Sequence, residues 1–226
     1  MSDKNSSTLS LGSRPDAATW ELGCSTVGID LLTSLRKASP TMDELKAFFA
    51  EQPSWLYMGG HFGSLQLFNQ AAHEGRAGAV SIKFNTDHVV VDIDGTTAKL
   101  SQSDGTFMVH STVLVILWGG CSVCDTTHTM KVLRTLFGNH VLLGFAGSTG
   151  WAMVDAMLGN GFIKKNHFFD NVKGKTDDLD AITNAWMKAA KAGYGSGAMA
   201  DRFRAIDYGG QGWKLSDGKI VKWLKV

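Results

Sequence analysis

The sequence predicts an α/β fold built on an open, mainly parallel sheet that is flanked by helices. Short apolar runs of strand length alternate with helical periodicity through the middle of the chain, which favours this architecture. The 226 residues are 44% hydrophobic and 19% charged, enough for one ordinary domain with a substantial core. No repeat or interior linker divides the chain, so we expect a single domain over 19–226. Residues 1–18, rich in Ser, Asp, Asn and Gly, are expected to form a flexible tail.

The first predicted elements are a helix and a strand. The helix spans Met42 to Ala50, with Thr41 as its N-cap and two acidic residues in its first turn. Pro53 ends this helical pattern, and Trp55 to Met58 forms the first apolar strand.

A small antiparallel meander is predicted next. Segments 79–84 and 88–93 have strand character, and the dipeptides Asp94-Gly95 and Asp104-Gly105 are turn signals.

The second half predicts strands and helices in alternation, followed by a hairpin. Residues 112–118 form the most apolar strand, without flanking charge, as expected for a strand buried on both faces. We expect helices over 126–137, 150–158 and 177–192, the last closing at Gly193, a strand over 141–145 and a C-terminal hairpin over 212–223.

Composition excludes several classes of function. The net charge of +1 offers no electrostatic basis for binding nucleic acid or an anionic membrane surface. No apolar run approaches the roughly 18 residues of a membrane helix, and residues 1–13 lack the apolar core of a secretory signal, so a cytoplasmic location is expected. Three cysteines do not suggest a disulfide framework; they fit a reducing compartment and a chemically useful thiol.

Two segments carry the candidate chemistry. Trp55-Leu-Tyr-Met-Gly-Gly-His61-Phe-Gly63 and Val113-Leu-Val-Ile-Leu-Trp-Gly-Gly-Cys121-Ser122 are both apolar runs that end in glycines. Residues just beyond the carboxyl ends of parallel strands converge at one crevice, so we expect His61 and Cys121 to meet there. A thiol beside an imidazole is the minimal apparatus for nucleophilic catalysis, and a helix N-terminus after Cys121 favours the thiolate further.

These two segments resemble the caspase-like (clan CD) cysteine peptidases, most closely the separase, CHAT and gingipain types. The resemblance spans about residues 54–160 and rests on the Gly-Gly-His61 loop, the Gly-Gly-Cys121-Ser122 loop and the meander between them. It implies that Cys121 is the nucleophile and His61 the general base or acid of an endopeptidase that forms a thioester with protein or peptide substrates. No cofactor or metal is implied.

The same resemblance points to the residues around the dyad. The oxyanion and substrate loop would comprise Phe62, Gly63, Gly120 and Ser122. The family has glycine directly after the histidine, whereas this chain has Phe62 there and Gly63 one step later. From their positions near the same sheet edge, Asp125 and Ser148 are candidates for a substrate pocket.

Other interpretations of these residues remain open. Cys121-Ser-Val-Cys124 has the spacing of a dithiol oxidoreductase motif, but all three prolines precede it, so the cis-proline of a thioredoxin fold is missing. Cys121, Cys124 and His128 have ligand-like spacing for zinc without a second pair of ligands. A non-enzymatic, caspase-like binding module is the third alternative, and Phe62 is the feature that favours it.

Overall fold

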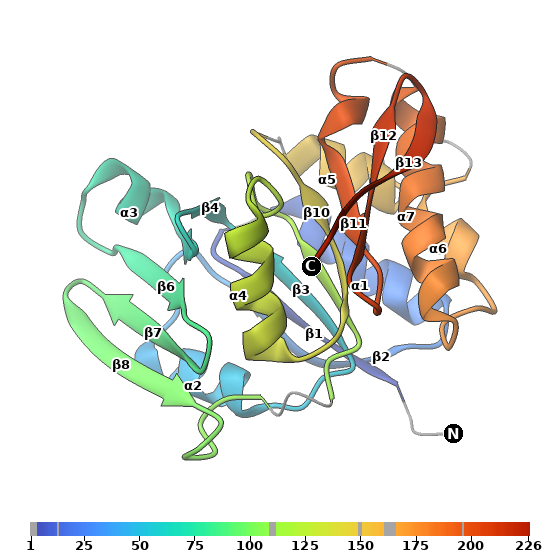
Figure 1. Ribbon diagram of the computed structural model, residues 1–226. Helices are drawn as coiled ribbons and strands as arrows, with labels where there is room; N and C mark the ends of the chain where they lie inside the picture. Colours follow the sequence, from blue (N-terminus) through green and yellow to red (C-terminus); the bar gives the residue numbers. More distant parts are fainter. Residues whose placement is uncertain (1–3, 13, 109–111, 149–150, 161–165, 196) are drawn as a thin grey trace.

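The computed structural model describes residues 4–12, 14–108, 112–148, 151–160, 166–195 and 197–226. Within these residues the chain has an α/β fold with a mixed sheet of eight strands (sheet A) and an antiparallel sheet of five strands (sheet B), as Figure 1 shows. The predicted class, α/β with a largely parallel main sheet, is therefore confirmed.

Sheet A is parallel through its first five positions and antiparallel at one end. Its parallel part has the order β2-β1-β3-β9-β10, and β11, β12 and β13 then extend it as antiparallel neighbours. The bounds are β1 Asn5–Ser10, β2 Asp30–Arg36, β3 Trp55–Gly59, β9 Val115–Trp118, β10 Val141–Phe145, β11 Phe203–Ile206, β12 Gln211–Ser216 and β13 Lys219–Lys225. The predicted C-terminal hairpin is thus the pair β12–β13.

Sheet B lies between β3 and β9 in the chain. It is an antiparallel series of β4 (His61–Gly63), β5 (Gln66–Phe68), β6 (Val80–Phe84), β7 (His88–Ile93) and β8 (Thr96–Ser101). The predicted meander is confirmed for β6 to β8, whose Asp94-Gly95 turn has both residues at positive φ, 48° and 85°. Asp104-Gly105 also lies in a turn, but residues 106–108 after it do not form a strand.

The helices match the sequence prediction where apolar periodicity is strong. The bounds are α1 Pro15–Thr26, α2 Met42–Ala50, α3 Gln70–Glu74, α4 Thr127–Phe137, α5 Trp151–Leu158, α6 Phe168–Val172 and α7 Leu179–Tyr194, with a 3-10 turn at Ala200–Arg202. Thr41 caps α2 in a full capping box with Glu44, as predicted from the sequence. Helix α7 runs past Gly193 and ends at Tyr194; Gly195, which follows it, has a positive φ of 62°.

The expectation of a flexible tail over residues 1–18 is wrong. Strand β1 lies between β2 and β3 in the interior of sheet A, and α1 begins at Pro15. Residues 6–10 are buried although four of them are Ser or Thr. Two of the hydroxyls have good partners inside the fold: Ser7 donates to Glu51 Oε2 at 2.9 Å and Ser10 to the Gly12 carbonyl at 3.0 Å. The buried Thr8 hydroxyl has no hydrogen-bond partner. The polar composition of these residues is the reason that the sequence did not indicate an interior strand.

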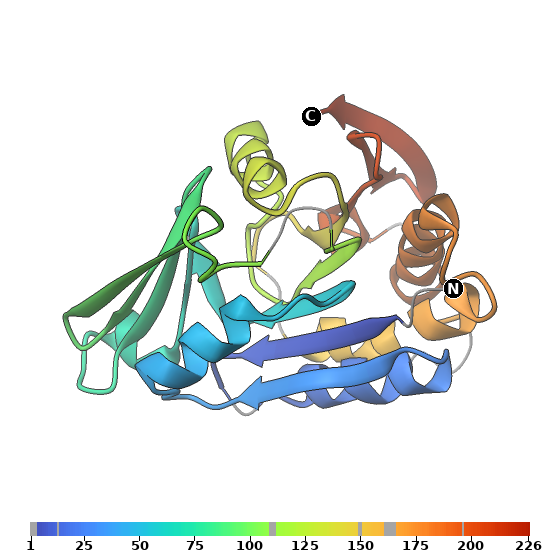
Figure 2. The same ribbon diagram turned by 90° about the horizontal axis from the view of Figure 1, so that it is seen from below.

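Sheet A separates two cores, as its alternating side chains require. On one face Tyr57 and Leu117 pack with α1, α5, α6 and α7. On the other face Met58 and Trp118 pack with α2, α4 and sheet B. Figures 1 and 2 show sheet B standing beside sheet A, next to α2 and α4. The strands that lead to the candidate site are thus held from both sides.

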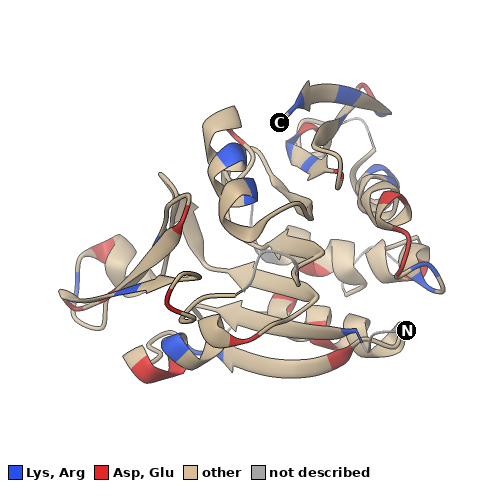
Figure 3. Ribbon diagram, turned by 60° about the horizontal axis from the view of Figure 1, so that its bottom comes forward, with Lys and Arg blue, Asp and Glu red and all other residues tan. Residues whose placement is uncertain are grey.

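Charges of both signs are spread over the molecule, with basic residues repeated along the C-terminal hairpin (Figure 3). Two cations cover tryptophan rings of this hairpin: Lys222 Nζ, from the hairpin itself, lies 5.6 Å from the Trp213 ring centroid, and the Arg204 guanidinium, from the neighbouring strand β11, lies 4.9 Å from that of Trp223. Among the described residues, every helix is too short or too polar to cross a bilayer.

Candidate functional site

The loops that carry His61 and Cys121 leave the same edge of sheet A and touch each other. Strands β3 and β9 pair in parallel, with Met58 opposite Trp118, and the Gly119 N–H donates to the Met58 carbonyl at 2.8 Å. A Cβ added at Gly120 would lie 3.1 Å from the Gly60 carbonyl oxygen and 2.9 Å from the Phe62 Cβ. The two predicted loops are therefore neighbours.

His61 is half-buried at the first position of β4, and several side chains surround its ring. Its Nε2 lies 2.6 Å from Gln70 Oε1. Its ring stacks on that of His73, with centroids 4.7 Å apart and planes 12° apart, and lies 5.7 Å from the Phe68 ring. Sequence reasoning missed Gln70 and His73, which come from α3, an element without a strong periodic signal.

Cys121 is half-buried in the turn of residues 121–124 that links β9 to α4. Ser122 has a positive φ of 58°, uncommon for a residue with a side chain. Its N–H donates to the Gly147 carbonyl at 2.9 Å, and the Cys124 N–H donates to the Phe145 carbonyl at the same distance. The turn is thus fastened to the end of β10.

The residues expected in the oxyanion and substrate loop have different environments. Phe62 is 6% exposed and packs edge-on against Trp118 at 5.3 Å, so its side chain is chiefly part of a core. Gly63 pairs with Gln66 across the tight turn of Ser64 and Leu65, both at positive φ. Gly120 is buried between the loops, and the Ser122 N–H already has an acceptor.

A cavity of about 430 Å³ adjoins the Cys121 turn. It is lined by Phe62, Leu65, Ser122, Asp125 and His128 among others. Asp125 is exposed, and its Oδ1 accepts a hydrogen bond from the Gly147 N–H. Ser148 is exposed in the loop after β10, where its carbonyl accepts from Arg202. Of the two residues predicted for a substrate pocket, Asp125 lies on this cavity.

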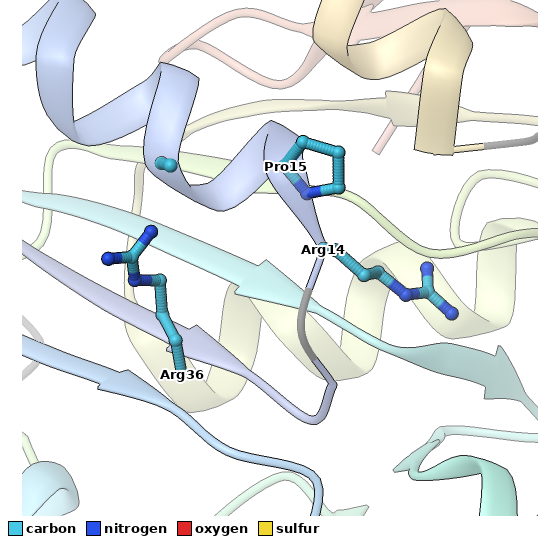
Figure 4. A pocket seen from close by; sticks show the side chains of 4 residues that line it. Arg14, Pro15 and Arg36 are labelled. Carbon is cyan, nitrogen blue, oxygen red and sulfur yellow. The ribbon is translucent and has the colours of Figure 1, made fainter.

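A second cavity, of about 410 Å³, lies where α1 begins and β2 ends. Arg14, Pro15, Ala18 and Arg36 line it, and Figure 4 shows Arg14 just before α1 and Arg36 at the end of β2, with side chains that extend in different directions. Sequence reasoning missed this basic cavity because it placed Arg14 in a tail.

A buried carboxyl–phenol pair lies behind the glycines of both loops. The Tyr57 hydroxyl donates to Asp16 Oδ2 at 2.6 Å, and both side chains are fully buried. Burial raises the pKa of Asp16 to about 6, against the lowering effect of the Tyr57 hydrogen bond, and burial also raises the pKa of Tyr57 well above its usual value.

This pair explains why two of the site glycines lack side chains. A Cβ at Gly59 or Gly119 would lie 2.6 Å or 2.2 Å from the Tyr57 hydroxyl oxygen. From the sequence, these glycines suggest a tight turn that admits a substrate. In the structure, Gly59 and Gly119 leave room for the phenol.

The other two cysteines are buried. Burial raises the pKa of Cys124 to about 12 and also raises the pKa of Cys24. Such thiols are poor nucleophiles, so Cys124 is a packing residue in this structure. Among the described residues, no three His, Cys, Asp or Glu side chains are grouped to hold a metal ion.

Comparisons with protein-family models, with curated proteins and with solved structures find no match to this chain.

Proposed function

We propose that this chain is a cysteine endopeptidase of the caspase-like type, with Cys121 as nucleophile and His61 as general base and acid. The observation that supports this most is the contact between the two loops, in which Gly120 packs against Gly60 and Phe62. Adjacent parallel strands in register carry the imidazole and the thiol from one sheet edge. The antiparallel sheet B between them in the chain agrees with the resemblance.

The proposed reaction proceeds through an acyl-enzyme. His61 takes the proton of the Cys121 thiol, and the sulfur forms a bond to the substrate carbonyl carbon. The tetrahedral intermediate collapses as the C–N bond breaks, and the His61 imidazolium gives its proton to the leaving amine. Water then attacks the thioester with His61 as base, which releases the new carboxyl group and restores the thiol.

The oxyanion contact would come from backbone N–H groups near Cys121. Because Gly63 is part of the β4–β5 hairpin and the Ser122 N–H is bonded to Gly147, we assign this contact to the backbone of Gly120.

Two cavities of opposite character are candidates for substrate side chains: one adjoins the Cys121 turn, and the other lies where β2 ends, at the carboxyl edge of sheet A. Asp125 supplies a carboxylate to one, and Arg14 and Arg36 supply cations to the other. Asp16 links the basic cavity to the loop before Cys121. It follows Arg14 by two residues, and its Oδ2 lies so close to Gly119 that a Cβ added there would be 3.2 Å away. A peptide library for this protein should therefore vary acidic and basic side chains on both sides of the scissile bond.

Selective alkylation tests the dyad without knowledge of the substrate. Iodoacetamide at neutral pH should label Cys121 rapidly in the native protein, and mass spectrometry of the digested protein would identify the site. Cys24 and Cys124, both buried, are internal controls that should react only after unfolding. His61→Ala should slow the labelling of Cys121 strongly, whereas His88→Ala, a change on the distant strand β7, should not.

Peptide cleavage completes the test. The wild-type protein should cleave members of the library, and Cys121→Ala should abolish cleavage. An unreactive Cys121 together with no cleavage would overturn the proposal and favour a binding module. A reversible Cys121–Cys124 disulfide would favour the dithiol alternative, which the burial of Cys124 opposes.

A further inference from the structure

We propose that Gln70, itself held by Glu74, is a positioning residue that directs Nδ1 of His61 to act as the base. This inference rests on the proposed function, since it specifies which nitrogen takes the thiol proton. It goes beyond the dyad because neither Gln70 nor Glu74 touches the reacting atoms.

The orientation of the Gln70 amide is determined by its neighbour Glu74. Gln70 Nε2 lies 2.6 Å from Glu74 Oε1, and Arg76 also donates to Glu74. Both hydrogen bonds lower the pKa of Glu74, and the one from Arg76 has the larger effect. Glu74 is therefore ionised near neutral pH. An ionised carboxylate only accepts hydrogen bonds, so the NH₂ end of the amide must face Glu74. The amide oxygen is then the end that faces His61.

The tautomer of His61 follows from this orientation of the Gln70 amide. Gln70 Oε1 is an acceptor only, and it lies 2.6 Å from His61 Nε2. Nε2 must therefore carry a hydrogen, and in the neutral ring the lone pair belongs to Nδ1. Nδ1 takes the proton of the Cys121 thiol, and the resulting imidazolium keeps its Nε2–H bond to Gln70.

The start of α3, which carries Gln70, is held in place by hydrogen bonds of Asn69. Gln70 is the first residue of α3, directly after the buried cap Asn69. Asn69 Oδ1 accepts from the N–H groups of Ala72 and Val80, and its Nδ2 donates to the carbonyls of Ala38 and Gly78 at 2.6 and 2.7 Å. The base of α3 is thus tied to its surroundings.

The plane of the His61 ring is held separately. Phe68, the cross-strand neighbour of His61, lies 5.7 Å from it with planes 20° apart, and His73 stacks at 4.7 Å. Stacking restricts tilting, and the Gln70 hydrogen bond restricts rotation within the plane. Together these contacts determine where Nδ1 points.

Nitrogen-15 NMR of the His61 side chain tests the tautomer directly, at a pH where the ring is neutral. The wild-type ring should be mainly the Nε2–H tautomer. Gln70→Ala removes the acceptor and should give a mixture of tautomers, whereas Gln70→Glu retains an acceptor oxygen and should preserve the Nε2–H form. Glu74→Gln, which can accept or donate, should loosen the amide and give an intermediate result. Gln66→Ala, on β5 and bonded to Ser81 instead, is the matched control.

Kinetics supply the second readout. Gln70→Ala should lower kcat on the order of tenfold with little change in KM, because the base is misdirected while substrate contacts remain. Gln70→Glu should recover part of this loss and shift the acidic limb of the pH–rate profile to higher pH, since a carboxylate stabilises the imidazolium. Circular dichroism should show that all four variants fold.

The outcomes separate this inference from the proposed function. An Nδ1–H ring in the wild type, or a tautomer unaffected by Gln70→Ala, would overturn the positioning role even if the protein cleaves peptides. An Nε2–H ring that depends on Gln70, in a protein without peptidase activity, would retain the positioning of His61 and refute the peptidase.

Discussion

Replacing Asp16 with Asn should stabilise the protein at neutral pH. Asp16 is fully buried against Tyr57, and burial raises its pKa from 3.8 to about 6. A shift of that size corresponds to about 3 kcal/mol between the protonated and ionised forms of the folded state. The wild-type protein carries this cost wherever the carboxyl group is ionised, and asparagine does not.

The sign of the pH dependence follows from the raised pKa. At about pH 3 and below, Asp16 is largely protonated in both the folded and the unfolded state, so its burial carries no ionisation cost. As the pH rises from about 4 to about 6, the unfolded chain loses this proton before the folded chain does, so the wild-type stability falls. Above the folded pKa of about 6 the loss is complete. The advantage of Asp16→Asn should therefore grow over this interval and then level off.

Asparagine suits the site because it imitates the protonated acid. Its Oδ1 can accept from the Ala17 N–H, which lies 3.2 Å from Asp16 Oδ1, and its amide N–H can donate to the Tyr57 hydroxyl. The substitution therefore removes the charge, while the Tyr57 hydroxyl, which donates to Asp16 Oδ2 in the wild type, becomes an acceptor; the cost of this exchange is the same at every pH.

Urea unfolding of both proteins at a series of pH values from about 3 to about 8 measures the effect. Over this range the difference in unfolding free energy should change by about 3 kcal/mol in favour of the variant. Asp217→Asn, on the exposed turn of the C-terminal hairpin, controls for the loss of one negative charge. A difference that is constant with pH, or a variant less stable than the wild type at pH 8, would refute this reasoning.

Three further changes test other parts of the structure. Gly119→Ala forces a methyl group to 2.2 Å from the Tyr57 hydroxyl and should lower the free energy of unfolding in denaturant by about 1–3 kcal/mol. Gly63→Ala, with open space around its Cβ, should lower it less. Equal losses for the two variants would contradict the packing described. Thr41→Ala removes the cap of α2 and should lower stability by about 1 kcal/mol in the same assay, and an unchanged midpoint would count against the capping box. Cys124→Ala should leave the alkylation rate of Cys121 unchanged, because Cys124 is buried; a large fall in that rate would implicate both thiols.

Much of the fold could be predicted because its signals are local. Strands β3, β9 and β10 are buried on both faces, so their sequences are continuous apolar runs. The hairpin β12–β13 and the turn at Asp94 carry Asp-Gly signals. The proximity of the His61 and Cys121 loops followed from the rule that parallel strands end at one edge.

The rest could not be predicted because its causes are long-range or lack a sequence signature. Strand β1 is made largely of Ser and Thr, and its burial depends on partners such as Glu51, over forty residues away. The β4–β5 turn uses Ser64 and Leu65 at positive φ without the usual glycine or asparagine. Gln70 and Asp16 act through individual hydrogen bonds to residues of other elements, His61 and Tyr57. Hydrophobic periodicity does not indicate such contacts.

The position of β1 makes residues 5–10 indispensable to the architecture. This strand alone joins β2 to β3, so a deletion of residues 5–10 would cut the main sheet rather than trim its border. During synthesis β1 emerges before both of its neighbours, and one of them, β3, follows only about fifty residues later.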